Sequence, residues 1–139
     1  MTTRPPAGPA PAPPTWTIHR HASVVSTNDL AASLPPWHAM VAEQQTGGRG
    51  RHGRTWVSDP GGLWLSVVVP TPGAPEPWSL LPLAAGWAVR SALYVLGVRG
   101  LHLRWPNDVM SGPAKLAGIL VERFHSGTAV IGIGLNCTN

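Results

Sequence analysis

Only one segment of this chain carries a long helical pattern, and short strand-like runs lie on both sides of it. Between residues 79 and 96, apolar and small residues recur every three or four positions, and Gly97 follows as a stop signal. The expected strands cover residues 16–21, 38–43, 63–69, 101–105, 115–124 and 129–135. This pattern predicts an α+β fold with a mixed, mainly antiparallel sheet and the helices packed on one face.

Local signals predict how several of these elements begin and end. Ser26 and Asp29 are spaced like a capping box, so a short helix is expected around residues 30–32. Residues 56–58 are expected to form a hairpin with the 63–69 strand across the turn at 59–62. Residues 1–15 are rich in proline and alanine and are expected to be a disordered tail. The folded domain should therefore span residues 16–139.

Composition restricts the cellular compartment in which the chain is expected and the kinds of partner that it can bind. Cys137 is the only cysteine, which excludes an intrachain disulfide and favours a reducing cytoplasm. No apolar run reaches the roughly 18 residues of a membrane span. The formal charge is +4, but outside residues 49–54 the cations are scattered, so a small anionic ligand is favoured over nucleic acid. The six histidines are dispersed, and no metal site is expected.

The stretch from Glu43 to Trp56 is the strongest candidate for a binding loop. It contains four glycines, three arginines and two glutamines, and it has no apolar face at the period of a helix or of a strand. Backbone N–H groups and guanidinium groups in such a loop can close around an anion. The only lysine, Lys115, lies in a second segment of similar character. Together these features indicate chemistry on a phosphate or a carboxylate.

Several short motifs, each weak alone, follow one another in a distinctive order. They are Ser26-Thr27-Asn28, Glu43-x-Gln45-x-x-Gly48-Arg49-Gly50-Arg51-x-Gly53-Arg54-x-Trp56, Leu63-x-Leu65-Ser66, Trp105-Pro106-Asn107-Asp108, Lys115-Leu116-Ala117-Gly118-Ile119-Leu120-x-Glu122 and Gly132-x-Gly134-x-Asn136. The last motif lacks the third glycine and the following helix of a dinucleotide site. In this order the series resembles the catalytic domain of biotin protein ligases, from about Ser23 to the end of the chain.

This resemblance implies the fold of class II aminoacyl-tRNA synthetases and biotin ligases, incomplete at the C-terminus. It implies that ATP and Mg²⁺ activate biotin to biotinyl-5'-AMP, which a lysine of a biotin carboxyl carrier domain then attacks. It also allows a homodimer. No repressor role is expected, because a proline-rich tail stands where some members of the family carry a winged helix-turn-helix domain.

The resemblance also assigns roles to individual residues. Lys115 and Arg51 are the expected catalytic residues. The expected biotin-binding residues are Ser26, Thr27, Asn28, Gln45, Arg49, Gly50, Arg51, Lys115 and Gly118. The expected nucleotide-binding residues are Arg54, Trp56, Asn107, Asp108, Gly134 and Asn136.

Three alternatives remain at this point. A lipoate or octanoate ligase shares the fold and the adenylation chemistry, although the Gly/Arg loop favours biotin. A non-catalytic, truncated fragment could bind biotin or a partner protein without turnover. A nucleic-acid-binding module rests only on the net charge and the Gly/Arg loop, and it would bind with strong salt dependence.

Overall fold

The computed structural model describes residues 11–71, 80–123 and 127–139. Its elements are β1 (Thr17–Val24), α1 (Thr27–Ala31), β2 (His38–Gln45), η1 (Arg51–Gly53), β3 (Gly62–Pro70), α2 (Leu81–Val95), β4 (Leu101–Arg104), β5 (Asp108–Ser111), β6 (Ala114–Glu122) and β7 (Thr128–Asn136). Most of the predicted tail at 1–15, residue 79 at the start of the predicted long helix and residue 124 at the end of the predicted 115–124 strand lie outside the described residues.

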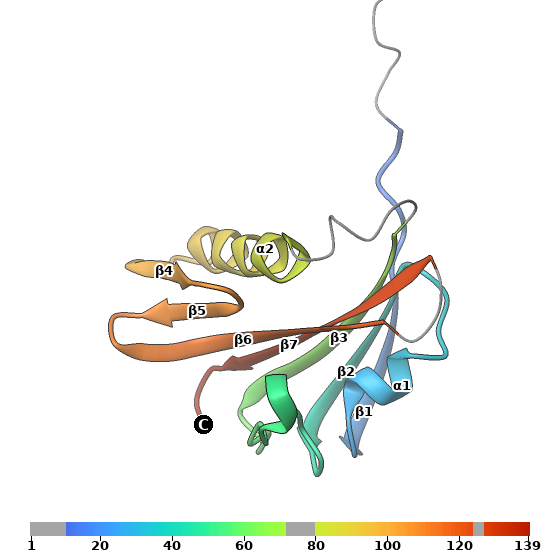
Figure 1. Ribbon diagram of the computed structural model, residues 1–139, viewed down its shortest axis with the longest axis horizontal. Helices are drawn as coiled ribbons and strands as arrows, with labels where there is room; N and C mark the ends of the chain where they lie inside the picture. The colour runs from blue at the N-terminus through green and yellow to red at the C-terminus, as the bar shows by residue number, and fades with distance from the viewer. Residues whose placement is uncertain (1–10, 72–79, 124–126) are drawn as a thin grey trace, which may run out of the picture.

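A seven-stranded sheet in the order β1-β2-β3-β7-β6-β5-β4 organises the described part of the chain (Figure 1). β1 and β2 are parallel, and every other neighbouring pair is antiparallel. The parallel pair needs a crossover, and the segment containing α1 supplies it. The predicted α+β fold with a mixed, mainly antiparallel sheet is therefore confirmed.

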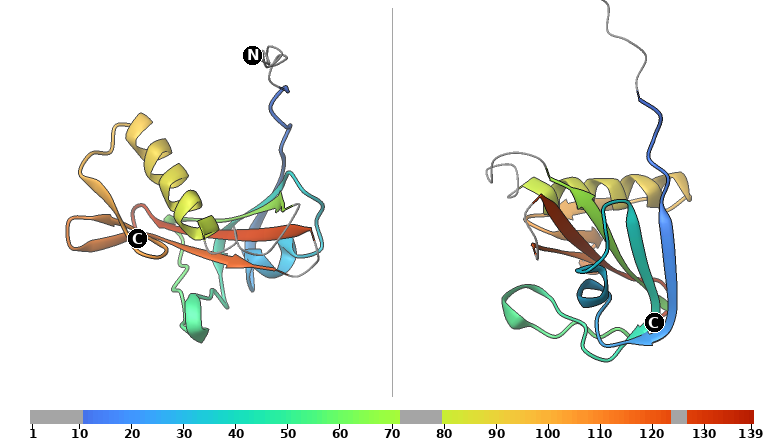
Figure 2. Two further views of the ribbon diagram at one scale, coloured as in Figure 1. Left: turned by 45° about the horizontal axis from the view of Figure 1, so that its top comes forward. Right: turned by 90° about the vertical axis from the view of Figure 1, so that its right-hand side faces the viewer.

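The two α-helices lie on opposite faces of the sheet rather than on one face as expected (Figure 2). Ala31 of α1 packs against Met40, Val68 and Val130. The α2 residues Val89 and Leu93 belong to a second cluster with Leu101, Val109, Ala117 and Leu135. Side chains alternate between faces along a strand, and both faces of the central strands are apolar. Each face of the sheet therefore needs a helix packed against it.

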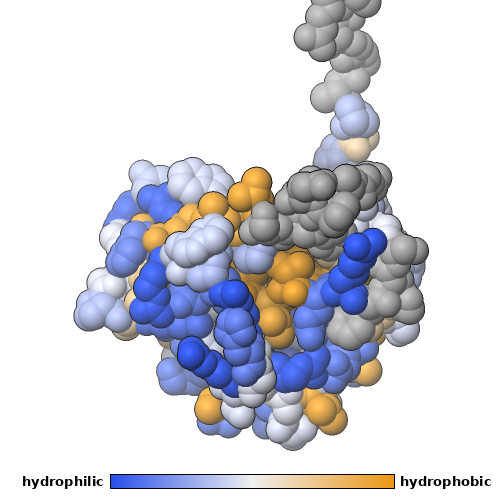
Figure 3. All heavy atoms as spheres, in the orientation of Figure 1, coloured by the Kyte–Doolittle hydropathy of each residue, from blue (hydrophilic) through white to orange (hydrophobic). Residues whose placement is uncertain are grey.

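The face of α2 that meets the sheet differs from the face formed by the regularly spaced apolar and small residues that predicted the helix. Gly86 is the buried residue of α2, close to Leu103 of β4. Trp87 is one of the regularly spaced residues that were expected to face the sheet, but it is 59% exposed. Figure 3 shows hydrophobic residues over α2 and in a hollow at the middle of that view, with hydrophilic residues around them. In the described part of the chain, no helix is long and apolar enough to cross a membrane.

Two local predictions were wrong, and one strand was missed. Residues 56–58 do not pair with β3; Ser58 instead forms an antiparallel bridge with Gln45. Ser26 occupies the N-cap of α1, but its side chain makes no capping hydrogen bond. β5 was not predicted, because only two of its four residues, Val109 and Met110, are buried, and such a short run is hard to distinguish from a turn.

Candidate active site

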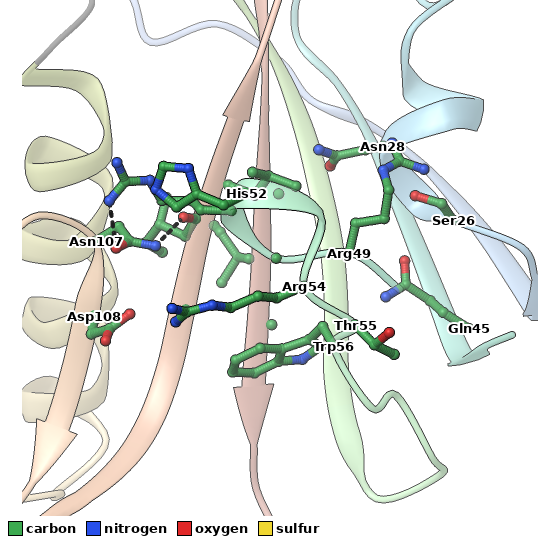
Figure 4. Close-up of a pocket in the computed structure, with 18 of the residues that line it drawn as sticks. Ser26, Asn28, Gln45, Arg49, His52, Arg54, Thr55, Trp56, Asn107 and Asp108 are labelled. Carbon is green, nitrogen blue, oxygen red and sulfur yellow. Dashed lines mark hydrogen bonds between the residues drawn. The ribbon is translucent and has the colours of Figure 1, made fainter. Parts of the chain in front are cut away.

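A cavity of about 460 Å³ opens on the α1 side of the sheet. Its walls come from the N-terminus of α1, the Gly/Arg loop, the segment entering β5, and the middle of β6 and β7. Figure 4 shows Ser26, Asn28 and Gln45 at one end, Asn107 and Asp108 at the other, and the loop residues between them. The cavity therefore joins two ends of different chemistry.

Gln45 anchors a hydrogen-bond network at the first end. Its Oε1 accepts from the backbone N–H of Thr27 at 2.8 Å and from the Thr27 hydroxyl at 3.0 Å. Its Nε2 donates to the hydroxyl of Ser58 at 2.9 Å. Because a backbone N–H can only donate, the orientation of the Gln45 amide is fixed. The network thus holds Thr27 in one position on the cavity wall.

Asn28 is held from both sides in the same network. Its Nδ2 donates to Glu122 at 2.6 Å, and its Oδ1 accepts from the fully buried hydroxyl of Ser66 at 2.6 Å. Ser66 also lies 2.7 Å from the Thr27 hydroxyl. Sequence reasoning gave no role to Ser66. A serine inside an otherwise apolar strand was the available signal, because buried hydroxyl groups need partners.

Ser66→Ala should destabilise the protein by about 1–3 kcal/mol, because it leaves the buried Oδ1 of Asn28 without its donor. Chemical denaturation of the two proteins measures this difference. Ser33→Ala is the matched control, since Ser33 is exposed and its hydroxyl makes only a 3.3 Å contact with the Leu30 carbonyl. Equal free energies of unfolding for Ser66→Ala and Ser33→Ala would contradict this account of the network.

Three glycines on β6 and β7 leave room for the side chains of the site. A Cβ on Gly132 would lie 2.5 Å from Oδ1 of Asn28, and one on Gly134 would lie 2.5 Å from Nε1 of Trp56. A Cβ on Gly118 would meet Lys115 at 3.0 Å and the Trp56 ring at 3.1 Å. These residues are glycines because side chains pack directly against the strand backbone here. Gly132 was absent from the predicted site residues.

Cationic groups dominate the other end of the cavity. Nζ of Lys115 lies 2.7 Å from Oδ1 of Asp108, and Nη2 of Arg104 lies 2.6 Å from Oδ2. Burial disfavours the charged form of Asp108, but the hydrogen bonds and charges of Lys115 and Arg104 outweigh it and hold the pKa of Asp108 below its usual value. Asp108 is the only carboxylate among the described residues that line the cavity.

Trp56 lies between the two ends. The Lys115 ammonium is 4.8 Å from the centre of its ring, a cation–π distance. The Nε1 atom of Trp56 is buried and has no hydrogen-bond partner among the described residues. This atom lies against Gly134 of β7, where a Cβ would come within 2.5 Å of it. Trp56 thus offers a flat ring to a ligand in the cavity.

The three loop arginines are directed differently. Nη1 of Arg51 lies 3.4 Å from Oδ1 of Asn107. The Nδ2 of Asn107 donates to the carbonyl of Ile119 at 2.8 Å. Figure 4 shows Arg54 extending across the cavity toward the side of Asp108. Arg49 instead turns toward α1 and forms ion pairs with Asp29 and Glu122.

The fold brings the predicted site residues together around this cavity, with one exception. Those that line it are Ser26, Thr27, Asn28, Gln45, Arg49, Gly50, Arg51, Arg54, Trp56, Asn107, Asp108, Lys115, Gly118 and Gly134. Asn136 does not line the cavity, and its Nδ2 donates to the Lys115 carbonyl at 3.3 Å. That contact supports the strand carrying Lys115.

Known proteins resemble this chain in sequence and in structure. The profile of the biotin/lipoate A/B protein ligase family matches residues 17–136. A biotin–[acetyl-CoA-carboxylase] ligase of Mycobacterium tuberculosis is 43% identical over 104 residues, which are 71% of this chain and 39% of the relative.

Two solved structures have the same architecture. The biotin protein ligase of Leishmania major in complex with biotinyl-5-AMP has a TM-score of 0.80 and 35% identity, covering 92% of this chain and 59% of that one. The Aquifex aeolicus biotin protein ligase with biotin and ATP has a TM-score of 0.78 and 36% identity, covering 86% and 51%. This chain therefore spans between about two fifths and three fifths of these relatives.

Proposed function

Because this chain belongs to the biotin/lipoate A/B protein ligase family, and within it to the biotin protein ligases, we propose that it activates biotin with ATP and transfers it to a lysine of a biotin carboxyl carrier domain. The observation that carries this proposal is a single cavity with neutral hydrogen-bonding groups at one end and cations at the other. Biotin has the same polarity, with an uncharged ureido ring at one end and a carboxylate at the other.

At the neutral end, Ser26, Thr27, Asn28 and Gln45 would bind the ureido ring. The ring needs acceptors for two N–H groups and a donor for its carbonyl oxygen, and hydroxyl groups can serve as either. Because Gln45 and Ser66 hold Thr27 and Asn28 in place, the ring would meet a rigid pattern of partners. A fixed pattern favours a ligand with matching groups over one that lacks them.

At the cationic end, the carboxylate of biotin would attack the α-phosphate of ATP, and pyrophosphate would leave. Two anions must approach each other in this step, so cations are needed to offset their repulsion and to stabilise charge in the transition state. Lys115, which lies beside Trp56 and Gly118, would take this role. Arg51 and Arg54 supply further positive charge from the loop.

Mg²⁺ would enter this site with the nucleotide. Asp108 already pairs with Lys115 and Arg104, and the described residues contain no group of three or more metal-ligating side chains. Mg²⁺ bound through substrate phosphates with few protein ligands matches this set of donors. When bound, the ion neutralises phosphate charge.

In the second step, a lysine of the carrier domain would attack the mixed anhydride, forming an amide and releasing AMP. A cytoplasmic setting and the absence of a nucleic-acid partner belong to the same proposal, which also allows a homodimer. The supporting features are the single cysteine, which suits a reducing compartment, and positive charge concentrated at the cavity rather than along a helix.

A comparison of biotin with lipoate tests the substrate, because the family includes ligases for both acids. We expect calorimetry to detect biotin binding at least about tenfold tighter than lipoate binding, since the dithiolane ring of lipoate cannot pair with the polar groups near Gln45. Valerate, which has the carboxylate without the ring, is the control for charge alone. Equal or tighter binding of lipoate would overturn the choice of biotin.

A further inference from the structure

Backbone hydrogen bonds from Thr46 and Gly47 to the carbonyls of Val24 and Val25 hold the base of the Gly/Arg loop. The tip of the loop, residues 49–55, is fastened to other elements mainly through one side chain. Arg49 donates to both carboxylate oxygens of Asp29, from Nη1 at 3.0 Å and from Nη2 at 2.7 Å. Its Nη2 also lies 3.2 Å and 3.4 Å from the two oxygens of Glu122. Asp29 belongs to the first turn of α1, and Glu122 ends β6. One guanidinium therefore joins the loop to two separate elements.

The rest of the loop tip has few contacts outside itself. Within the loop, the Gly50 N–H donates to the Arg54 carbonyl and the Arg54 N–H donates to the Arg51 carbonyl. Residues 51–55 are exposed. Apart from the Arg49 pairs, the polar contact between this tip and another part of the described chain is that of Arg51 with Asn107, at 3.4 Å. The position of the tip over the cavity thus depends chiefly on Arg49.

Glu122 connects this fastening to the wall of the cavity. Its Oε2 accepts from Nδ2 of Asn28 at 2.6 Å as well as from Arg49. The other end of the Asn28 amide accepts from Ser66. One carboxylate therefore sets both the position of the loop and the orientation of Asn28.

We propose that Asp29 and Glu122 are positioning residues that clamp the 46–55 loop over the cavity through the guanidinium of Arg49. In this assignment Arg49 does not bind the reacting anions, and that task falls to Arg51, Arg54 and Lys115. The proposal rests on the biotin ligase function only where it concerns substrate. The contacts themselves involve residues of this chain alone.

Trypsin cleavage of the ligand-free protein tests the clamp without any assay of function. Trypsin cuts after arginine, so loosening the loop should speed cleavage after Arg51 and Arg54. Partly exposed ion pairs are individually weak, and we expect Asp29→Asn and Glu122→Gln each to accelerate cleavage about threefold and the double variant about tenfold. Glu43→Gln is the matched control, because this exposed carboxylate forms no ion pair with any residue that the structure describes.

The effect of salt on the cleavage rate gives a second test of the clamp, made on the wild-type protein with the double variant as reference. Raising NaCl to about 1 M screens exposed charges, so it should accelerate cleavage of the wild-type loop toward the rate of the double variant and leave the double variant unchanged. A fluorogenic arginine peptide corrects for the effect of salt on trypsin. If the variants and high salt both leave the cleavage rate at the wild-type value, the clamp is overturned.

Steady-state kinetics separate positioning from a purely structural effect. We expect Asp29→Asn to raise KM for biotin about threefold and Glu122→Gln to raise it about tenfold, because only Glu122 also holds Asn28, with no change in thermal midpoint. An inactive wild-type chain with faster cleavage in the variants would reject the function and retain the clamp. An active wild-type chain whose variants are cleaved at the wild-type rate would retain the function and reject the clamp.

Discussion

Lys115→Ala is expected to lower the rate of biotinyl-5'-AMP formation by at least about a hundredfold, while the protein stays folded. Loss of one preorganised donor from a transition state typically costs this much. Lys115 is the only lysine of the chain, and it lies beside Trp56 and Gly118 on the cavity wall. Its side chain is one-third exposed, at 33%, so removing it leaves a small defect in packing.

The thermal midpoint should confirm that Lys115→Ala is folded, because Asp108 keeps its pair with Arg104. Arg99→Ala is the control for net charge, since Arg99 packs on Tyr94 near the end of α2 rather than in the cavity. Release of pyrophosphate from ATP, measured with and without biotin, gives the rate. A Lys115→Ala variant within threefold of the wild-type rate would remove Lys115 from the mechanism.

Gly132→Ala is expected to weaken biotin binding by roughly ten- to a hundredfold. The new Cβ would lie 2.5 Å from Oδ1 of Asn28 and 3.0 Å from its Cγ. Asn28 is 4% exposed and is held by Ser66 and Glu122, so it cannot turn away without breaking a buried hydrogen bond. Overpacking of this kind costs about 1–3 kcal/mol.

Calorimetric titration with biotin measures this loss. Gly86→Ala is the matched control, because a Cβ there would approach no atom closer than Cδ2 of Leu103 at 3.4 Å, and alanine is the better helix former. Gly86→Ala should bind biotin as the wild type does. If Gly132→Ala also binds biotin with wild-type affinity, Asn28 does not form the wall of the biotin site.

Sequence periodicity predicted the long strands well because their burial alternates. β3 shows this most clearly, with Trp64, Ser66 and Val68 buried on one face. β5 escaped prediction because four residues are too few to show a period. The face of α2 was also missed. Its apolar residues surround much of the helix, and only tertiary packing selects Gly86, Val89 and Leu93 for the sheet.

The candidate site was predictable where a motif lies in one stretch of sequence and unpredictable where distant residues meet. The triplet at 26–28, the Gly/Arg loop and Lys115 could be located because each has a local pattern. The partners of Arg49 could not, since Asp29 and Glu122 are 20 and 73 residues away from it. The side chain of Asn136 turns to the Lys115 carbonyl instead of lining the cavity, and its expected role in nucleotide binding stays a prediction.

Formation of the adenylate tests the central claim most directly. The purified chain, shown to be folded by near-UV circular dichroism, is incubated with biotin, ATP and Mg²⁺ and assayed for biotinyl-5'-AMP and pyrophosphate. We expect both products in equal amounts, and neither when biotin is omitted. A folded chain that binds biotin but forms no adenylate would contradict the proposed activity of these 139 residues and favour a non-catalytic biotin-binding role.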